Sequence, residues 1–341
     1  MEYSEISFPI FGDGFVVNPP SYITLFGFNL YIYGLFITLG FILAGLYIYK
    51  RRETFGLTQD NVLDLIILAV PCGIVGARLY YALFNFSDYF GPGNWLNIFR
   101  VREGGLAVYG GVIGGAIAIY IYSRIKKIPF GKLVDAAGFG LFIGQAVGRW
   151  GNFFNREAFG VATNVPWKMG LNQYSGYVYV HPTFLYESLW NIIGFILLHT
   201  FSKRIKGKYY GQYFLCYVAW YGFGRYMIEG LRTDSLFVSG TDLRISQLLA
   251  ALSFSVAVIL LTRHRLRGTQ NVVAFAGGPA QENAELLDED EAEDENAESG
   301  MLNAELLDED TDENADENAV FDGNEDTETE ENADTIDSQD D

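Results

Sequence analysis

The chain has 341 residues, half of them hydrophobic, and a formal net charge of −19. This net charge conceals two unlike segments, because residues 1–268 hold all 23 basic residues and 14 acidic ones, a charge of +9, whereas residues 269–341 hold 28 acidic residues and no basic one. The composition therefore excludes a uniformly acidic protein and indicates a basic membrane segment followed by an acidic tail, with no nucleic-acid partner expected.

Seven apolar runs in the first segment are long enough to cross a bilayer, for which a helix needs roughly 17–25 residues. They occupy residues 28–49, 62–84, 106–122, 133–154, 183–201, 210–228 and 245–262. Glycine is frequent inside them, as in GGLAVYGGVIGG at residues 104–115, and small residues favour close packing of membrane helices. We therefore expect an all-α integral membrane protein, a bundle of seven transmembrane helices.

Basic residues fall in clusters after every second run, beginning with the first. Fourteen of the 23 lie at residues 50–52, 124–132, 203–208 and 263–267. Cytoplasmic loops of membrane proteins carry an excess of Lys and Arg, so the alternation predicts an N-terminus outside and a C-terminus in the cytosol. Residues 156–180, between the fourth and fifth runs, contain Trp167 and three tyrosines, and we expect them to form a small outward head region at the interface, which aromatic rings favour.

Ten residues at the end of the fourth run, GRWGNFFNRE from Gly148 to Glu157, carry two arginines, two asparagines and a glutamate. Arg149 lies at membrane depth, where removing a charge from water is costly, so an ionisable group there indicates function. The alternative is an interfacial arginine whose side chain extends to the lipid headgroups. Five polar groups within nine residues favour a functional site.

Further arginines lie on the same outward side: Arg78 in GARLYY, and Arg225 and Arg232 in GRYMIEGLRTD. Guanidinium groups gathered at one depth would form a pocket for an anionic headgroup, because they bind phosphate through paired hydrogen bonds. The alternative is packing through ion pairs: Arg149 with Glu157, Arg225 with Glu229, and Arg232 with Asp234.

A second polar cluster, HPTFLYES, opens the fifth run. Pro182 is typical of the first turn of a helix, which puts Glu187 about one turn inside the membrane. Of the three histidines, only His181 lies on the side of the arginines. The alternative for His181 is a helix-end or interfacial role.

Taken together, these segments resemble the prolipoprotein diacylglyceryl transferase family. GRWGNFFNRE resembles the family signature, and IYGLFITLGF, GARLYY, EGGLAVYGG, HPTFLYES and GRYMIEGLRTD agree with it in order and spacing. The resemblance covers roughly residues 20–265. It implies a seven-span enzyme of the bacterial cytoplasmic (inner) membrane whose active site faces the outer leaflet, which agrees with the topology predicted from charge.

The resemblance implies transfer of the diacylglyceryl group from phosphatidylglycerol to a thiol. The acceptor is the lipobox cysteine in the signal peptide of a prolipoprotein, the product is a thioether, and glycerol phosphate leaves. Such a reaction requires a deprotonated thiol and fixed cations for the developing phosphate charge. Membrane lipids surround the enzyme, and neither a metal nor another cofactor is implied.

The resemblance also assigns roles to residues of the matching motifs. The implied catalytic residues are Arg149, Tyr109, Arg225 and Glu229. The implied substrate-binding residues are Tyr33, Arg78, Arg149, Asn152, Asn155, Glu157, His181, Glu187 and Arg232. Arg149 and Arg225 would hold the phosphate.

One position departs from the family pattern, because Tyr109 in GGLAVYGG stands where many members carry a histidine proposed as the base. Tyrosine, with a reference pKa of about 10, is a poor base at neutral pH. Either the base is elsewhere, with His181 and Glu229 as candidates, or the arginines activate the thiol without a dedicated base. We favour the second hypothesis.

The remaining segments add no chemistry. Cys72 and Cys216 fall inside apolar runs, where a free cysteine behaves as a small apolar residue. Residues 269–341 repeat NAELLDED and hold too few apolar residues for a core, so we expect a disordered acidic cytosolic tail after a membrane transferase domain at residues 1–268. A binding role for basic cytosolic partners is a further hypothesis for this tail.

Two other classes of protein remain open from the residues alone. A seven-span transporter or lipid-binding protein would use the same arginines to hold an anion without chemistry, but it commonly shows inverted repeats, and we find no convincing one. A receptor whose cytosolic tail is its output would leave the intramembrane arginines unexplained.

Overall fold

The structure is a computed structural model that describes residues 5–12, 14–90, 95–100, 104–173, 176–204 and 209–267. The acidic tail predicted at residues 269–341 lies outside the described residues, and so the domain division stays a prediction.

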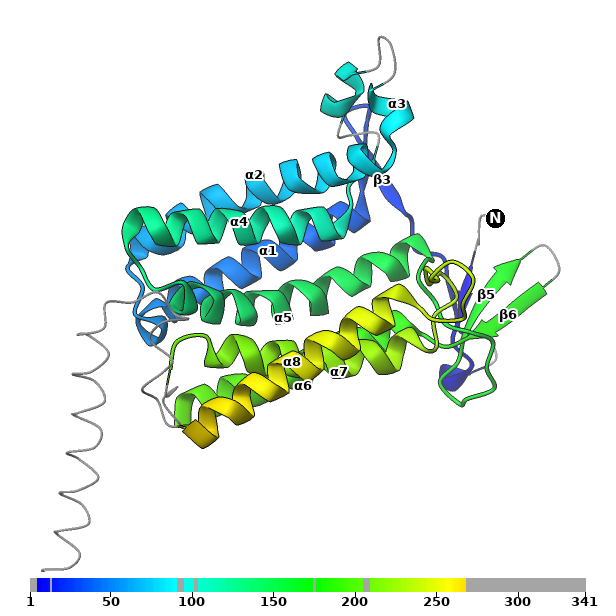
Figure 1. The fold of residues 1–341 in the computed structure, drawn as a ribbon. Coiled ribbons are helices and arrows are strands. Elements are labelled where there is room, and N and C mark those ends of the chain that lie inside the picture. Colours follow the sequence, from blue (N-terminus) through cyan, green and yellow to red (C-terminus); the bar gives the residue numbers. More distant parts are fainter. Residues whose placement is uncertain are drawn as a thin grey trace, which may run out of the picture. The chain divides into compact units, whose positions relative to one another are not determined.

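Long helices dominate the described residues (Figure 1). They are α1 (Ile32–Lys50), α2 (Gln59–Phe84), α4 (Val108–Lys126), α5 (Phe130–Asn155), α6 (Thr183–Arg204), α7 (Gln212–Glu229) and α8 (Ile245–Arg267). Six of them, all except α7, are long and apolar enough to cross a membrane. The chain is therefore a multi-pass membrane protein that is mostly helical.

The prediction placed the start of the first span at residue 28, which is four residues too early. Phe28–Tyr31 form strand β4, which pairs antiparallel with β3 (Tyr22–Leu25), and α1 begins at Ile32. Hydropathy alone does not separate this apolar strand from the helix that follows it, because both are rich in the same residue types.

Helix α5 lies at the centre of the bundle and contacts α1, α4, α6 and α7, while α2 packs on α4 and α7 packs on α8 (Figure 1). Glycines allow close approach of backbones, as the sequence predicted. A Cβ on Gly76 of α2 would lie 2.5 Å from the carbonyl oxygen of Gly110 on α4, and one on Gly40 of α1 would lie 3.2 Å from the Cα of Gly144 on α5. Any larger residue would separate these helices.

The prediction of an all-α fold is incomplete, because the head region contains a small sheet. Its strands are β1 (Ile6–Ser7), β2 (Val16–Val17), β5 (Met169–Gln173) and β6 (Gly176–Val180), all antiparallel in the order β2-β1-β5-β6. Buried residues of β1, β5, β6 and α6 form a hydrophobic core beneath the sheet. The N-terminal segment thus belongs to the head.

Short elements complete the described chain. These are the helical turns η1 (Pro9–Phe11), η2 (Arg52–Phe55), α3 (Phe86–Phe90) and η3 (Trp95–Phe99). Helices α2, α5 and α7 end, and α4, α6 and α8 begin, at the end of the bundle that also carries both sheets (Figure 1). The polar motifs of the sequence therefore meet at this one end.

Candidate functional site

Three arginines converge on one buried glutamate, Glu187, in the second turn of α6. The Glu187 side chain is only 4% exposed, and its Oε1 lies 2.7 Å from Nη1 of Arg225 and 3.2 Å from Nη1 of Arg232. Its Oε2 pairs with Nη2 of Arg149. Both carboxylate oxygens are therefore held by guanidinium groups from α5, from α7 and from the segment after α7.

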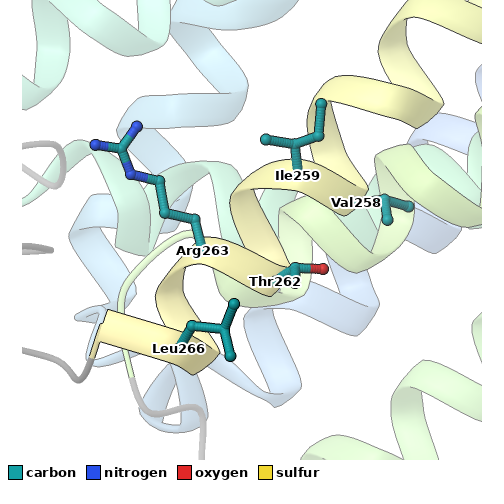
Figure 2. A pocket seen from close by; sticks show the side chains of 5 residues that line it. All are labelled: Val258, Ile259, Thr262, Arg263 and Leu266. Atoms are coloured by element: carbon teal, nitrogen blue, oxygen red, sulfur yellow. The ribbon is translucent and has the colours of Figure 1, made fainter.

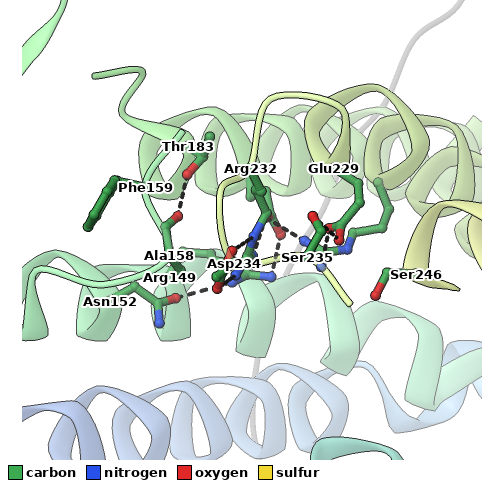
Figure 3. Close-up of polar contacts among 12 residues, drawn as sticks. Arg149, Asn152, Ala158, Phe159, Thr183, Glu229, Arg232, Asp234, Ser235 and Ser246 are labelled. Atoms are coloured by element: carbon green, nitrogen blue, oxygen red, sulfur yellow. Dashed lines mark hydrogen bonds and ion pairs between the residues drawn. The ribbon is translucent and has the colours of Figure 1, made fainter. Parts of the chain in front are cut away.

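Glu229, at the last position of α7, is the second buried carboxylate of this region. Its Oε2 lies 2.6 Å from Nη2 of Arg225, one helical turn earlier, and its Oε1 accepts a hydrogen bond of 2.9 Å from Ser235. Arg244 donates to the backbone carbonyl of Glu229. We call Arg149, Glu187, Arg225, Glu229 and Arg232 the charged cluster; Figure 3 shows part of it.

Arg232 also holds a more exposed carboxylate, that of Asp234. Its Nε donates to Oδ1 at 2.9 Å and its Nη2 to Oδ2 at 2.6 Å, a bidentate pair drawn in Figure 3. The hydrogen bonds from Arg232 hold the pKa of the Asp234 carboxyl below its usual value.

The three guanidinium groups of the charged cluster meet three carboxylates, the buried Glu187 and Glu229 and the more exposed Asp234. The side chains of Arg149 and Arg225 remain 22% and 15% exposed, against 4% for Glu187. In a medium of low dielectric, guanidinium groups that are fixed in place and still reach solvent can attract an anion. The arrangement can therefore hold a phosphate at the accessible edges of Arg149 and Arg225.

The decapeptide fixes Arg149 through its own polar residues. Nη1 of Arg149 donates to Oδ1 of Asn152 at 3.2 Å, and Nδ2 of Asn152 donates to Oε1 of Glu157 at 2.9 Å. Asn155 donates to the same glutamate oxygen at 3.4 Å. Helix α5 ends where Arg156 takes a left-handed backbone conformation, φ 54°. That turn brings Glu157 back towards Asn152.

Tyr33, in the first turn of α1, packs against the decapeptide. A Cβ on Gly151 would lie 2.6 Å from the Tyr33 ring, so the glycine is needed for the ring to lie against α5. The loop after α5 is joined to the segment after α7, because Gly160 forms a β-bridge with Arg232. Thr183 at the start of α6 donates to the carbonyl of Ala158 (Figure 3). Three distant segments of the chain are thereby tied together around Arg232.

Of the three ion pairs considered from the sequence, two are present: Arg225 with Glu229, and Arg232 with Asp234. The structure pairs Arg149 with Glu187 instead of Glu157.

Arg78 is buried in a different set of contacts. Its guanidinium donates to the backbone carbonyls of Asn97 at 2.7 Å, Ile98 at 2.9 Å and Gly104 at 2.6 Å, and also to those of Arg100 and Gly105. Arg78 therefore braces the loop between α2 and α4. In the described residues it is not joined to the charged cluster.

Tyr109 and His181 lie at the margins of the site. Tyr109, in the first turn of α4, is half-exposed, and its hydroxyl is 3.4 Å from the hydroxyl of Ser246 on α8. Nδ1 of His181 is 3.0 Å from the Tyr186 hydroxyl, which accepts a hydrogen bond of 2.7 Å from Nε1 of Trp167.

Ser235, Arg244 and Ser246 were not predicted to belong to the site. They lie in or just after the short connection between α7 and α8, and isolated serines and a lone arginine in a loop form no pattern. Only the return of the chain over the end of α7 brings them to Glu229 and Tyr109.

Within the part of the chain that the structure describes, no group of three or more His, Cys, Asp or Glu side chains is arranged to hold a metal ion. A pocket lies along α8, lined by Val258, Ile259, Thr262, Arg263 and Leu266 (Figure 2). It belongs to the half of α8 that is far from Ser246 and has no part in the charged cluster.

Comparison with known proteins gives a consistent result. The family described as prolipoprotein diacylglyceryl transferase matches residues 20–263. A phosphatidylglycerol–prolipoprotein diacylglyceryl transferase of Clostridioides difficile is 44% identical over 236 residues, which cover 69% of this chain and 91% of the relative. Proteins of the same name from Enterococcus faecalis and Finegoldia magna are 41% and 40% identical, covering 71% of this chain and 88% and 94% of their own lengths.

Proposed function

The chain belongs to the prolipoprotein diacylglyceryl transferase family, and we propose that it transfers the diacylglyceryl group of phosphatidylglycerol to the thiol of a prolipoprotein cysteine. It is a transmembrane transferase of lipoprotein biosynthesis. The observation that carries the assignment of its active site is the charged cluster, because it gathers three arginines from the family motifs around one buried glutamate.

The phosphate of phosphatidylglycerol binds to the accessible edges of Arg149 and Arg225. Glu187 holds both guanidinium groups in place before the lipid arrives, so little reorganisation is needed when charge develops on the leaving group. Asn152 and Glu157 fix the side chain of Arg149 and the turn that follows it.

In the reaction, the thiolate sulfur attacks the glyceryl carbon that bears the phosphate. A carbon–sulfur bond forms, the carbon–oxygen bond breaks, and its electron pair leaves with glycerol phosphate. The two arginines stabilise the negative charge on the departing phosphate, and the thiol proton passes to solvent or to the leaving group. The product is the thioether-linked lipoprotein precursor.

We assign thiol activation to the positive field of the arginines. Glu229 is a poor base because Arg225 and Ser235 occupy its two oxygens. Tyr109 lies at the margin of the site, with its hydroxyl 3.4 Å from that of Ser246. His181 is engaged with Tyr186. A nearby cation favours the thiolate form of a cysteine without any dedicated base.

We further propose that α7 is a seventh span. Its 18 residues extend about 27 Å, close to the thickness of the hydrocarbon core, and it packs against α5, α6 and α8. Seven spans and the basic clusters put the N-terminus outside, the C-terminus in the cytosol, and the charged cluster at the outer leaflet of the bacterial cytoplasmic membrane. The acceptor is then a lipobox cysteine presented from that side.

The test uses the purified full chain in detergent with phosphatidylglycerol and a synthetic lipobox peptide, followed by mass spectrometry. We expect a diacylglyceryl adduct on the peptide cysteine that requires phosphatidylglycerol and is absent from a Cys→Ser peptide. Arg149→Ala should abolish the adduct while accumulating normally in the membrane, and Arg265→Ala, an exposed arginine near the far end of α8, should not. No adduct from folded wild-type protein refutes the proposal.

A further inference from the structure

Two tryptophans on neighbouring helices, Trp190 of α6 and Trp220 of α7, stack face to face. Their ring centroids are 4.4 Å apart and their planes differ by 17°. Each indole also donates to the backbone of the other residue: Nε1 of Trp190 lies 3.0 Å from the Trp220 carbonyl, and Nε1 of Trp220 lies 2.9 Å from the Trp190 carbonyl. The backbone carbonyl of each tryptophan thus accepts the indole N–H of the other, which is the only polar group of that side chain inside the membrane segment.

A glycine four residues after each tryptophan makes this contact possible. A Cβ on Gly224 would lie 2.0 Å from Nε1 of Trp190, and a Cβ on Gly194 would lie 2.4 Å from Nε1 of Trp220. In a helix, the carbonyl of a residue bonds to the N–H four residues later, so glycine at that position opens the carbonyl to the other helix. We call Trp190, Gly194, Trp220 and Gly224 the Trp–Gly clasp.

The Trp–Gly clasp lies just below the charged cluster. Trp190 follows Glu187 by three residues, and Trp220 precedes Arg225 by five, which correspond to about 4.5 Å and 7.5 Å along the helix axes. Helix α6 starts at the site and α7 ends there (Figure 1). Both tryptophans therefore lie deeper in the bundle than the charged cluster.

The Trp–Gly clasp can form in one axial register only. A slip of one residue would move each carbonyl by about 1.5 Å and turn it by about 100°, which would break both hydrogen bonds and push a side chain into an indole. Helix α5 also packs against the Trp–Gly clasp, since a Cβ on Gly194 would lie 2.7 Å from the ring of Phe142 on α5. Phe142 is two turns below Arg149 on the same helix.

We propose that the Trp–Gly clasp is a positioning device that fixes the register of α6 against α7 and so holds Glu187 opposite Arg225. Its effect on transfer rests on the proposed function. In lipid, no hydrophobic force selects a register between two apolar helices, whereas the clasp supplies directional bonds and shape. With the register fixed in this way, the Glu187 carboxylate lies 2.7 Å from the Arg225 guanidinium.

The main test measures the single-turnover rate of Gly224→Ala with enzyme in excess over the lipobox peptide, so that an inactive fraction does not lower the rate constant. We expect the rate constant to fall at least tenfold, together with loss of the exciton couplet that two stacked indoles give in far-UV circular dichroism. The matched control is Gly115→Ala on α4, whose Cβ would meet nothing within 4 Å; it should stay within twofold of wild type. A wild-type rate in a variant that has lost the couplet overturns the proposal.

Two further variants test the Trp–Gly clasp in other ways. If Gly224→Ala does not accumulate, Trp220→Phe removes one N–H but keeps a ring, and it should lose the couplet and slow transfer at least threefold; an unchanged rate counts against the clasp. A double-mutant cycle combines Gly224→Ala with Glu187→Gln and measures the midpoint of thermal unfolding of each variant. This measurement does not depend on enzymatic activity. The fall in unfolding midpoint of the double variant should be smaller than the sum of the falls in the two single variants, because both substitutions weaken the contact between Glu187 and Arg225. Strict additivity of the two falls overturns the proposal.

The failure of the proposed function is distinguishable from the failure of the clasp. Absence of any adduct with wild-type protein refutes the transferase assignment alone, and the double-mutant cycle still decides whether the clasp aligns Glu187 with Arg225.

Discussion

Glu187→Gln is the substitution that most directly tests how the charged cluster is held together. The side chain is 4% exposed and takes ion pairs from Arg149, Arg225 and Arg232. A glutamine keeps the shape but removes the charge and turns a donor towards one of the arginines. Breaking a buried ion pair by changing one partner costs about 3–5 kcal/mol, because the other charge stays buried and uncompensated. We expect Glu187→Gln to lower the free energy of unfolding by an amount in this range, with the destabilisation concentrated in α5, α6 and α7.

The control is Asp234→Asn, which removes another carboxylate from Arg232. Asp234 is 47% exposed, and ion pairs that reach solvent contribute only about 0–1 kcal/mol. Both variants are compared with wild type by thermal unfolding in detergent and by transfer of the diacylglyceryl group to a lipobox peptide. We expect Glu187→Gln to lower the unfolding midpoint clearly and to slow transfer at least a hundredfold, whereas Asp234→Asn changes the midpoint little. Equal effects of the two variants would refute the central role of Glu187.

Other expectations follow from single contacts. Tyr109→Phe should keep transfer within about threefold of wild type at neutral pH, and a loss beyond a hundredfold, typical of removing a general base, would contradict activation by the arginines. Arg78→Ala should lower stability by about 2–4 kcal/mol, measured by thermal unfolding, because the buried carbonyls of the loop before α4 lose their charged donor. Asp135→Ala should cost about 0.5–2 kcal/mol, because Asp135 of α5 accepts from the backbone N–H groups of Gly211 and Phe214 at the start of α7 and so caps that helix; an unchanged midpoint would exclude this cap. The pKa of Asp234 is lowered in the folded state, so its ion pair with Arg232 stabilises the protein fully above the ordinary aspartate pKa of about 4 and is lost as the pH falls through the lower folded-state pKa. On acidification, the midpoint of thermal unfolding should therefore fall less steeply in Asp234→Asn than in wild type. Equal pH slopes of the two midpoints would contradict the ion pair.

Hydropathy and length predicted the helices closely, because a membrane span must be apolar over its whole length whatever it packs against. The local ion pairs were also within reach: Arg225 and Glu229 are four residues apart on one helix, and such residues are neighbours on its surface. The sheet of the head region was not predicted, since strands of two residues such as β1 and β2 have no periodicity to detect.

The partner of Arg149 shows where prediction from the sequence stopped. Glu157 is eight residues away and was the natural candidate, yet Arg149 pairs with Glu187 on another helix. Arg78 was grouped with the other arginines by depth, but its guanidinium braces a neighbouring loop. Depth in the membrane is encoded along the chain, whereas the direction in which a side chain points across the bundle is not.

The sequence by itself determined that this protein is a membrane transferase of a known family, with polar motifs at the ends of its predicted spans, because hydropathy, charge distribution and motif order are properties of the chain. Only the tertiary structure decided that Glu187 is the common partner of three arginines and that α6 and α7 meet through a pair of tryptophans. These contacts join residues 30 or more positions apart, and the tryptophan pair forms because Gly194 and Gly224 leave room for the two indoles.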